Sequence, residues 1–173
     1  SNFTRKGLKD YAREAAKFIE TSEKPFFLSV NYPDAHRPFT TQVDGIPSNP
    51  LTGADVKPLA YFGLDSPDLR QQTADYYNCM AWLDSQIGEL LKVLESSGKR
   101  DNTRIIYLGD HGADLLRGKR TSYEGGVRIP LIVAGHGVNA QPARNDLVST
   151  LDLMPTLLEI SSAQAVSGLP GRS

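Results

Sequence analysis

Residues 104–135 read RIIYLGDHGADLLRGKRTSYEGGVRIPLIVAG, two apolar runs that flank a segment rich in charged residues. The runs 104–109 and 129–134 have the length and aliphatic content of buried strands. Between them lie one histidine, two aspartates, one lysine, one glutamate and three arginines. These charges are either only solvated or arranged around a site, and the rest of the chain decides between the two interpretations.

The rest of the chain alternates helical and strand-like patterns. Apolar residues recur at helical spacing from Leu8 to about Ile19 and, most clearly, over 69–97. The apolar run 25–31 predicts a third buried strand, and TLDLMPTLLEIS at 150–161 predicts a C-terminal helix. Helices and strands in this order predict an α/β fold with a mainly parallel sheet sandwiched by helices.

Residues that favour helix ends support two of these helices. Asp68 is placed to cap the start of the helix 69–97, and Gly98 is placed to end it. Asp152 or Thr150 lies near the start of the C-terminal helix.

Composition limits the classes of function. The 173 residues, 39% of them hydrophobic, suit one domain with a sizeable core. The formal charge of -1, without a run of like charges, gives no footprint for nucleic acid or for a membrane surface. No apolar stretch reaches the length of a membrane span. The single cysteine excludes an internal disulfide and a cysteine zinc cluster.

Two predicted strands end in residues that carry chemistry. Asp110 and His111 follow the strand 104–109, and Asp34 and His36 follow the run 25–31. Because ligands of α/β sheets bind outside the carboxyl ends of the strands, we expect these side chains at one edge of the sheet.

The residue types at this edge suit the hydrolysis of an anionic ester. A carboxylate beside an imidazole can hold a divalent cation, and Lys119 with Arg120 can hold an anion nearby. His36 can donate a proton to a leaving group. Phosphate and sulfate esters both fit this set. Taken singly, however, Asp110 with His111 also fits a plain turn, Lys119 a solvated lysine, and His36 a turn residue.

The sequence also resembles a known family. GDHGADLLRGKRTSYEGGVRIPLIV is similar to the second signature region of the sulfatases, members of the alkaline phosphatase superfamily. KPFFLSVNYPDAHRPF and the long stretch from TADYYNC to GDHG resemble other segments of that family, and LVSTLDLMPTLLEI and GLPGRS resemble its later ones. NYPDAHRPF and TADYYNC look closest to the heparan N-sulfatase, or sulfamidase, group.

The resemblance implies roles for four residues. Asp110 and His111 stand where the family places two ligands of its Ca²⁺, although an imidazole at position 111 leaves Mg²⁺ or Mn²⁺ open. Lys119 stands where a lysine contacts the sulfate. His36 stands where a histidine contacts the sulfate or the departing oxygen.

Three further residues receive a structural interpretation. Glu124 and Arg128 belong to the Tyr-Glu-Gly-Gly-Val-Arg block and are expected to form a structural ion pair beneath the loop. Asp34 either orients His36 or caps a turn, and the turn is the preferred interpretation.

The nucleophile of the family is absent from these residues. It is a formylglycine made from the first residue of Cys/Ser-x-Pro-x-Arg. Cys79 lies in the apolar helical pattern without the proline, and is expected to be a small buried residue. Ser48 has Pro50 after it but Thr52 where arginine is needed. No Asp-Asp pair, the other metal-ligand signature of the family, occurs either.

The sequence therefore predicts that residues 1–173 are the central to C-terminal part of a sulfatase catalytic domain. We expect a metal-dependent parent that carries formylglycine, hydrolyses a sulfate ester or N-sulfate of a sugar, and is periplasmic or extracellular. The chain alone is expected to be inactive and to self-associate through an uncovered sheet edge. Two alternatives remain: a phosphate or phosphonate ester hydrolase of the same superfamily, and a non-catalytic module that binds sulfated glycans.

Overall fold

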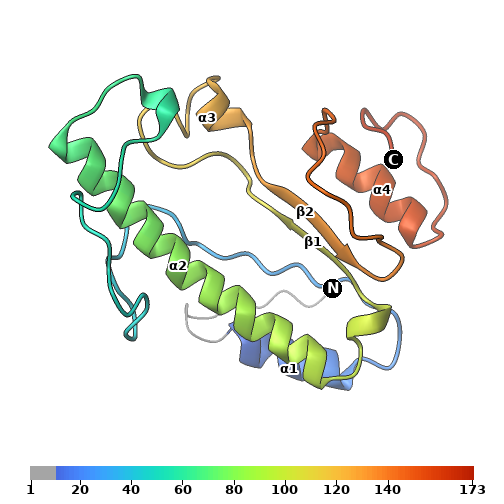
Figure 1. Cartoon of the computed structure of the whole chain (residues 1–173). Coiled ribbons are helices and arrows are strands. Elements are labelled where there is room, and N and C mark those ends of the chain that lie inside the picture. The colour runs from blue at the N-terminus through green and yellow to red at the C-terminus, as the bar shows by residue number, and fades with distance from the viewer. Residues whose placement is uncertain (1–10) are drawn as a thin grey trace. The chain divides into compact units, whose positions relative to one another are not determined.

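The computed structural model describes residues 11–173, and the chain divides into two compact units (Figure 1). The first unit extends to Val138 and contains both predicted site loops. The second unit is Asn139–Ser173. The expected helical position of Leu8 lies outside the described residues. None of the helices in the described chain is both long enough and apolar enough to cross a membrane.

Two helices form one side of the first unit. Helix α1 is Tyr11–Thr21 and helix α2 is Pro67–Ser96. Ala15, Ile19 and Leu94 are buried where these helices meet. Apolar side chains that pack around this centre come from both helices, from the extended segment that follows α1 and from the first strand: Phe18, Phe26, Leu28, Leu90, Val93 and Ile105.

The ends of α2 differ in part from expectation. Ser66, not Asp68, caps the start: its hydroxyl accepts a hydrogen bond from the Leu69 amide at 3.3 Å. Pro67 fills the first helical position, where no amide hydrogen is needed, and Asp68 lies in the first turn beside the positive end of the helix dipole. Gly98 has φ 70° and ends the helix as predicted, because a glycine adopts this left-handed conformation without steric cost.

The sheet is antiparallel, which corrects the prediction of a mainly parallel sheet. Strand β1 is Arg104–Leu108 and strand β2 is Leu131–Gly135, with Arg104 opposite Gly135 and Leu108 opposite Leu131. A parallel pair needs a crossover to the other end of the sheet, usually through a long helix. The link 109–130 contains only the short helix α3, Glu124–Val127, and returns to the end of the sheet that it left.

The run 25–31 is not a strand, contrary to prediction. Burial along it alternates as in a strand, since Phe26, Leu28 and Val30 are half-buried while Phe27 and Ser29 are exposed. No strand of the described chain pairs with it, and the ladder of backbone hydrogen bonds that defines a strand is missing. Its apolar pattern was therefore a correct sign of burial but not of pairing.

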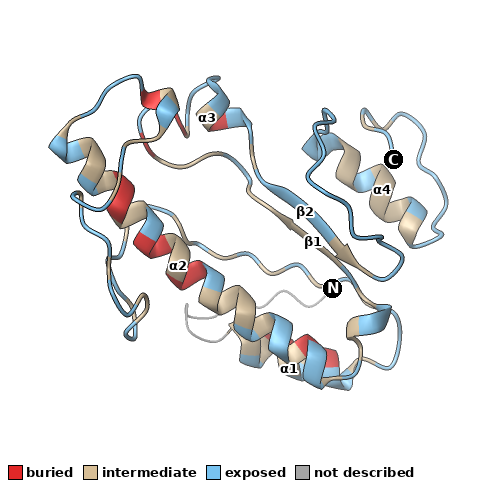
Figure 2. Ribbon diagram, in the orientation of Figure 1, coloured by how far each residue is buried: buried red, intermediate tan, exposed pale blue. Residues whose placement is uncertain are grey.

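A second group of buried residues lies on the first half of α2, shown in red in Figure 2. Its members are Thr73, Ala74, Asn78, Cys79, Trp82 and Leu83. Asn78 binds the backbone of Leu51 twice: its Oδ1 accepts from the amide at 2.8 Å and its Nδ2 donates to the carbonyl at 2.9 Å. These bonds hold the long irregular segment between α1 and α2 against the helix. That segment ends in the 3-10 helix η1, Ala60–Phe62, whose Phe62 is buried.

Three short elements complete the chain. The 3-10 helix η2, Arg100–Asn102, precedes β1. In the second unit, the 3-10 helix η3, Thr150–Asp152, leads into helix α4, Leu153–Ile160, as the sequence predicts. Ser149 and Asp152 cap η3 reciprocally, since each side chain accepts a hydrogen bond from the backbone near the other.

Candidate functional site

Asp110 and His111 follow β1 after Gly109, and their side chains contact each other. His111 Nδ1 is 2.8 Å from the Gly112 carbonyl, which can only accept, so Nδ1 is the donor. His111 Nε2 lies 3.4 Å from Asp110 Oδ2, and both side chains are exposed. The two atoms can share a proton or hold a cation between them at the end of β1.

The loop that carries this pair is tightly closed by backbone hydrogen bonds. The Gly112 amide donates to the Gly126 carbonyl at 2.9 Å, which joins the start of the loop to α3. The Lys119 amide donates to the Ala113 carbonyl at 2.7 Å. A Cβ atom on Gly112 would overlap the Gly125 carbonyl, so only glycine permits this approach. The local backbone thereby fixes where the loop turns back.

Lys119 lies near a second carboxylate, that of Asp114. Its positive charge, with those of Arg120 and Arg37, is among the causes that act on the pKa of Asp114. Arg120 also binds Asp114 directly, with Nη2 2.8 Å from Oδ1. No hydrogen bond or ion pair within the described residues engages the Lys119 ammonium. Its charge is thus available to an anion.

His36 lies in a turn that its own backbone closes, because its amide donates to the Pro33 carbonyl at 2.9 Å. The ring is exposed, and Nδ1 lies 2.7 Å from the Arg37 carbonyl, so Nδ1 is the donor and Nε2 points elsewhere. The next residue connects this turn to the loop after β1: Arg37 Nε donates to the Asp114 carbonyl at 2.8 Å. The structure thus ties together the two loops on which His36 and Lys119 lie.

Asp34 and Cys79 contact each other beneath the turn. The Cys79 thiol donates to Asp34 Oδ1 at 3.6 Å and accepts from the Thr40 hydroxyl at 3.8 Å. Cys79 is buried on α2, and this burial raises the pKa of its thiol, so that it is not poised as a nucleophile. The expectation of a buried, unreactive Cys79 agrees with this environment. The Asp34 carboxylate contacts α2 through the Cys79 thiol, and its role as the cap of a turn stays a prediction.

Glu124 and Arg128 do not form the expected ion pair. The contact between them is the backbone hydrogen bond from the Arg128 amide to the Glu124 carbonyl, at 2.9 Å, which closes α3. The spacing of four residues, which suggested an ion pair, is explained by one helical turn of backbone.

The side chains present fit a divalent cation only in part. Asp110 Oδ2 and His111 Nε2 are a suitable oxygen and nitrogen donor, but hard cations usually take six or more ligands. Among the described residues, no group of three or more histidine, cysteine, aspartate or glutamate side chains could hold a metal. These two residues would therefore supply two ligands of a cation, and its other ligands would come from elsewhere.

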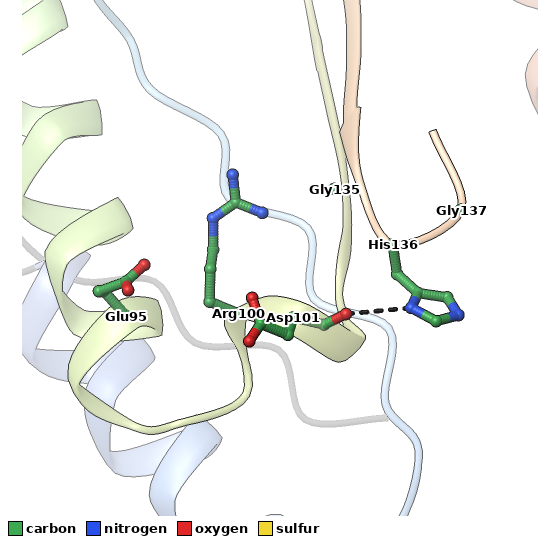
Figure 3. A pocket seen from close by; sticks show the side chains of 6 residues that line it. All are labelled: Glu95, Arg100, Asp101, Gly135, His136 and Gly137. Carbon is green, nitrogen blue, oxygen red and sulfur yellow. Dashed lines mark hydrogen bonds between the residues drawn. The ribbon is translucent and has the colours of Figure 1, made fainter. Parts of the chain in front are cut away.

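A hollow elsewhere in the first unit lies away from these residues (Figure 3). It occurs where β1 begins and β2 ends, at the opposite end of the ladder from Asp110, and encloses about 490 Å³. His136 Nδ1 lies 3.0 Å from the Asp101 carbonyl, which accounts for the third histidine as a structural residue. The lining is polar and comes from α2, η2 and the end of β2: Glu95, Arg100, Asp101, Gly135, His136 and Gly137.

Sequence reasoning missed two residues that connect the site loops, Arg37 and Asp114. Both stood in the segments identified as functional, and the charge of each was visible. Their partners were not, because Arg37 and Asp114 are far apart in the chain and no spacing rule joins them. A buried carboxylate between arginines is apparent only when both loops are folded.

Comparisons with known proteins assign the chain to a family. The family model described as Sulfatase matches residues 8–163. An ulvan-active sulfatase of Formosa agariphila is 35% identical over 98 residues, which are 56% of this chain and 16% of that protein. The multifunctional alkaline phosphatase superfamily protein PehA of Trinickia caryophylli is 28% identical over 188 residues, covering 87% of this chain and 37% of that protein.

A solved structure gives the same assignment for the fold. The crystal structure of Ps i-CgsB in complex with k-i-k-neocarrahexaose superposes on 99% of this chain and 38% of its own, with a TM-score of 0.73 and 24% identity. The chain thus spans well under half the length of each of these three proteins. The matched family model covers most of the described residues and includes both site loops. The chain belongs to the sulfatase family, within the alkaline phosphatase superfamily.

Proposed function

We propose that this chain supplies the metal-binding and sulfate-binding side of the active site of a sulfuric ester hydrolase that acts on a sulfated sugar. One observation carries the proposal most: Asp110 Oδ2 and His111 Nε2 lie 3.4 Å apart at the end of β1, where a carboxylate oxygen and an imidazole nitrogen can bind one cation. In a sulfatase, that charge lies next to the anion that is cleaved.

The residues of this chain have distinct roles in the proposed reaction. Asp110 and His111 bind the cation, for which Ca²⁺ is the first choice and Mg²⁺ or Mn²⁺ the alternatives. A bound divalent cation draws electron density from a sulfate oxygen. Lys119 adds a second positive charge, since the described residues leave its ammonium without a bonded partner. His36, when both of its ring nitrogens carry a proton, donates the proton of Nε2 to the departing oxygen or nitrogen.

The nucleophile is proposed to come from outside these residues, as a formylglycine in a Cys/Ser-x-Pro-x-Arg motif. Cys79 is unsuitable because it is buried and its thiol pKa is raised. Residues 1–173 would then be the central to C-terminal part of a catalytic domain that is completed in the intact protein. A periplasmic or extracellular location would suit enzymes that act on sulfated glycans.

The substrate class is proposed from the names of the relatives and from the sequence. One relative is named for activity on ulvan, and the Ps i-CgsB structure holds a neocarrahexaose. Both names point to a sugar. NYPDAHRPF and TADYYNC favour an N-sulfated sugar within this class. PehA carries the name of a multifunctional protein of the superfamily, which makes phosphate and phosphonate esters the alternative substrates.

The test is an assay of the protein expressed from its complete reading frame, with Ca²⁺ present. The substrates are an aryl sulfate, an N-sulfated glucosamine and an aryl phosphate. We expect hydrolysis of a sulfated substrate at the highest kcat/KM, and a loss of at least about a hundredfold on Lys119→Ala. Asp65→Asn, which removes an exposed ion pair with Arg70, is the matched control and should leave the rate unchanged.

Two outcomes would contradict the proposal. A higher kcat/KM on the aryl phosphate would favour the phosphatase alternative. Binding of sulfated glycan without turnover of any substrate would favour the non-catalytic module.

A further inference from the structure

We propose that Asp114 is the positioning residue of the anion site, and that it holds Lys119 and the loop of His36 in their working places. This inference rests on the proposed function, because it assigns a role within the same site. Asp114 does not need to touch the substrate. It acts through the cations that it gathers from two loops.

The contacts of Asp114 connect three parts of the first unit. Its Oδ1 accepts from Arg120 Nη2 at 2.8 Å, within the loop after β1. Its carbonyl accepts from Arg37 Nε at 2.8 Å, across to the turn that carries His36. Arg37 in turn donates through Nη2 to Gln72 Oε1 at 2.7 Å, on α2. The Asp114 carboxylate thus bonds within its own loop, its backbone carbonyl bonds Arg37, and Arg37 in turn contacts α2.

The electrostatics of Asp114 agree with a role as an ionised centre. Burial raises the pKa of its carboxyl, but the hydrogen bond from Arg120 and the charges of Arg120, Arg37 and Lys119 outweigh this and lower the pKa below its usual value. The side chain of Asp114 is only 16% exposed. A carboxylate that is mostly buried and ionised stays so because cations surround it. Its own charge attracts these three cations, of which Arg120 is bonded to the carboxylate and Arg37 to the backbone carbonyl of Asp114.

The ion pair of Asp65 with Arg70 serves as a comparison for the ion pair of Asp114 with Arg120. Asp65 also accepts from an arginine, at 2.6 Å, but both side chains are substantially exposed and belong to neighbouring turns of the chain. Such a pair contributes little to stability or position. The Asp114 side chain is less exposed, at 16% against 51% for Asp65, and its backbone carbonyl is bonded to the turn of His36. The cations that act on its carboxylate include the lysine proposed to contact the sulfate.

Removal of the Asp114 charge should lower kcat without raising KM. In the protein from the complete reading frame, we expect Asp114→Asn to lower kcat for an aryl sulfate by about tenfold to a hundredfold, because Lys119 and His36 lose their alignment with the transition state. KM should stay the same or fall, because the site loses a negative charge that repels the anion. Asp114→Glu should restore part of kcat, and Asp65→Asn should change neither constant.

Limited trypsin digestion of the same variants tests the loop without reference to activity. Asp114→Asn should accelerate cleavage after Lys119 and Arg120 several-fold, because the loop is released, while Asp65→Asn should match the wild type. An unchanged kcat, or a rise in KM that accounts for the whole loss, would overturn the role of Asp114. If the wild type cleaves no sulfated substrate, the proposed function fails, and unchanged digestion by trypsin would then overturn the role of Asp114 separately.

Discussion

At the scale of single residues, Asn78 shows how buried polar groups organise the first unit. It is almost fully buried on α2, yet both of its amide atoms are used by the backbone of Leu51. A buried side-chain amide can bond the backbone amide and carbonyl of a loop residue, as a neighbouring strand would. It thereby holds the loop in place although the loop is neither strand nor helix. Through Leu51, the helix determines the course of the long segment that begins at the His36 turn.

We predict that Asn78→Ala destabilises the first unit by about 2 to 3 kcal/mol, because the buried Asn78 side chain would be lost together with both of its hydrogen bonds to the Leu51 backbone. Urea denaturation followed by tryptophan fluorescence would measure the change, since Trp82 lies one turn further along α2. Gln71→Ala is the matched control: Gln71 Oε1 accepts from the Gly53 amide at 3.0 Å and its Nε2 donates to Asp75 Oδ1 at 2.9 Å, and both bonds are exposed. Its loss should cost less than about 1 kcal/mol. Equal effects of the two changes would contradict the role of burial.

The sequence predicted the chemistry of single residues better than their contacts. Asp110 and His111 were expected at a strand end because β1 has a clear apolar pattern, and they lie there. Cys79 was expected to be buried because it stands in the apolar pattern of a helix. The roles of Arg37 and Asp114 could not be predicted, because their contact joins two loops that no local pattern relates.

At the scale of elements, the helices were predicted well and the sheet was not. Helix α2 is defined by its own periodicity and by Gly98 at its end, all of which are local. Strand pairing depends instead on residues elsewhere in the chain. The apolar runs indicated partial burial for β1 and for alternate residues of 25–31, whereas Leu131, Ile132 and Val133 of β2 are exposed. Nor could the pattern tell that β1 and β2 are antiparallel or that 25–31 lacks a paired neighbour among the described residues.

The cap of the second unit gives a prediction of pH dependence. Asp152 Oδ1 accepts from the Arg172 amide at 3.0 Å and Oδ2 accepts from the Ser149 amide at 2.9 Å. These two backbone bonds, that of Arg172 first, hold the pKa of Asp152 below its ordinary value of 3.8. A lowered pKa means that the stabilisation is complete above the ordinary value and is lost as the pH falls through the lower, folded value.

We therefore expect the amide resonances of Ser149 and Arg172 to shift together on acidification, at a pH below 3.8. Asp152→Asn should abolish this shift and fray the start of α4 at neutral pH. Asp146→Asn is the control, because Asp146 pairs with Arg144 at 2.6 Å but caps no helix. If the two amides shift at a pH above the ordinary value, the hydrogen bonds do not favour the ionised carboxylate.

At the scale of the whole molecule, the proposal is that residues 1–173 supply one side of an active site and that the other side lies outside them. Asp110 and His111 provide two ligands for a cation, and the described residues offer no group of three. The sequence has no Cys/Ser-x-Pro-x-Arg motif, and its single cysteine is buried. We therefore expect this chain to bind a cation only weakly and to lack turnover, whereas the protein expressed from its complete reading frame should turn over its substrate.

We predict that the 173-residue chain binds Ca²⁺ only weakly, with a Kd on the order of 1 mM, because one carboxylate and one imidazole leave most of the coordination sphere to water. It should also lack turnover on an aryl sulfate. Calorimetry would measure the affinity, and the His111 ring resonances, compared in the wild type and in Asp110→Asn, would show whether the ion binds at this pair. Asp101→Asn, at the opposite end of the ladder, is the control. Tight binding that persists in Asp110→Asn would place the ion elsewhere. Turnover that vanishes on Lys119→Ala would show that these residues already hold a complete site.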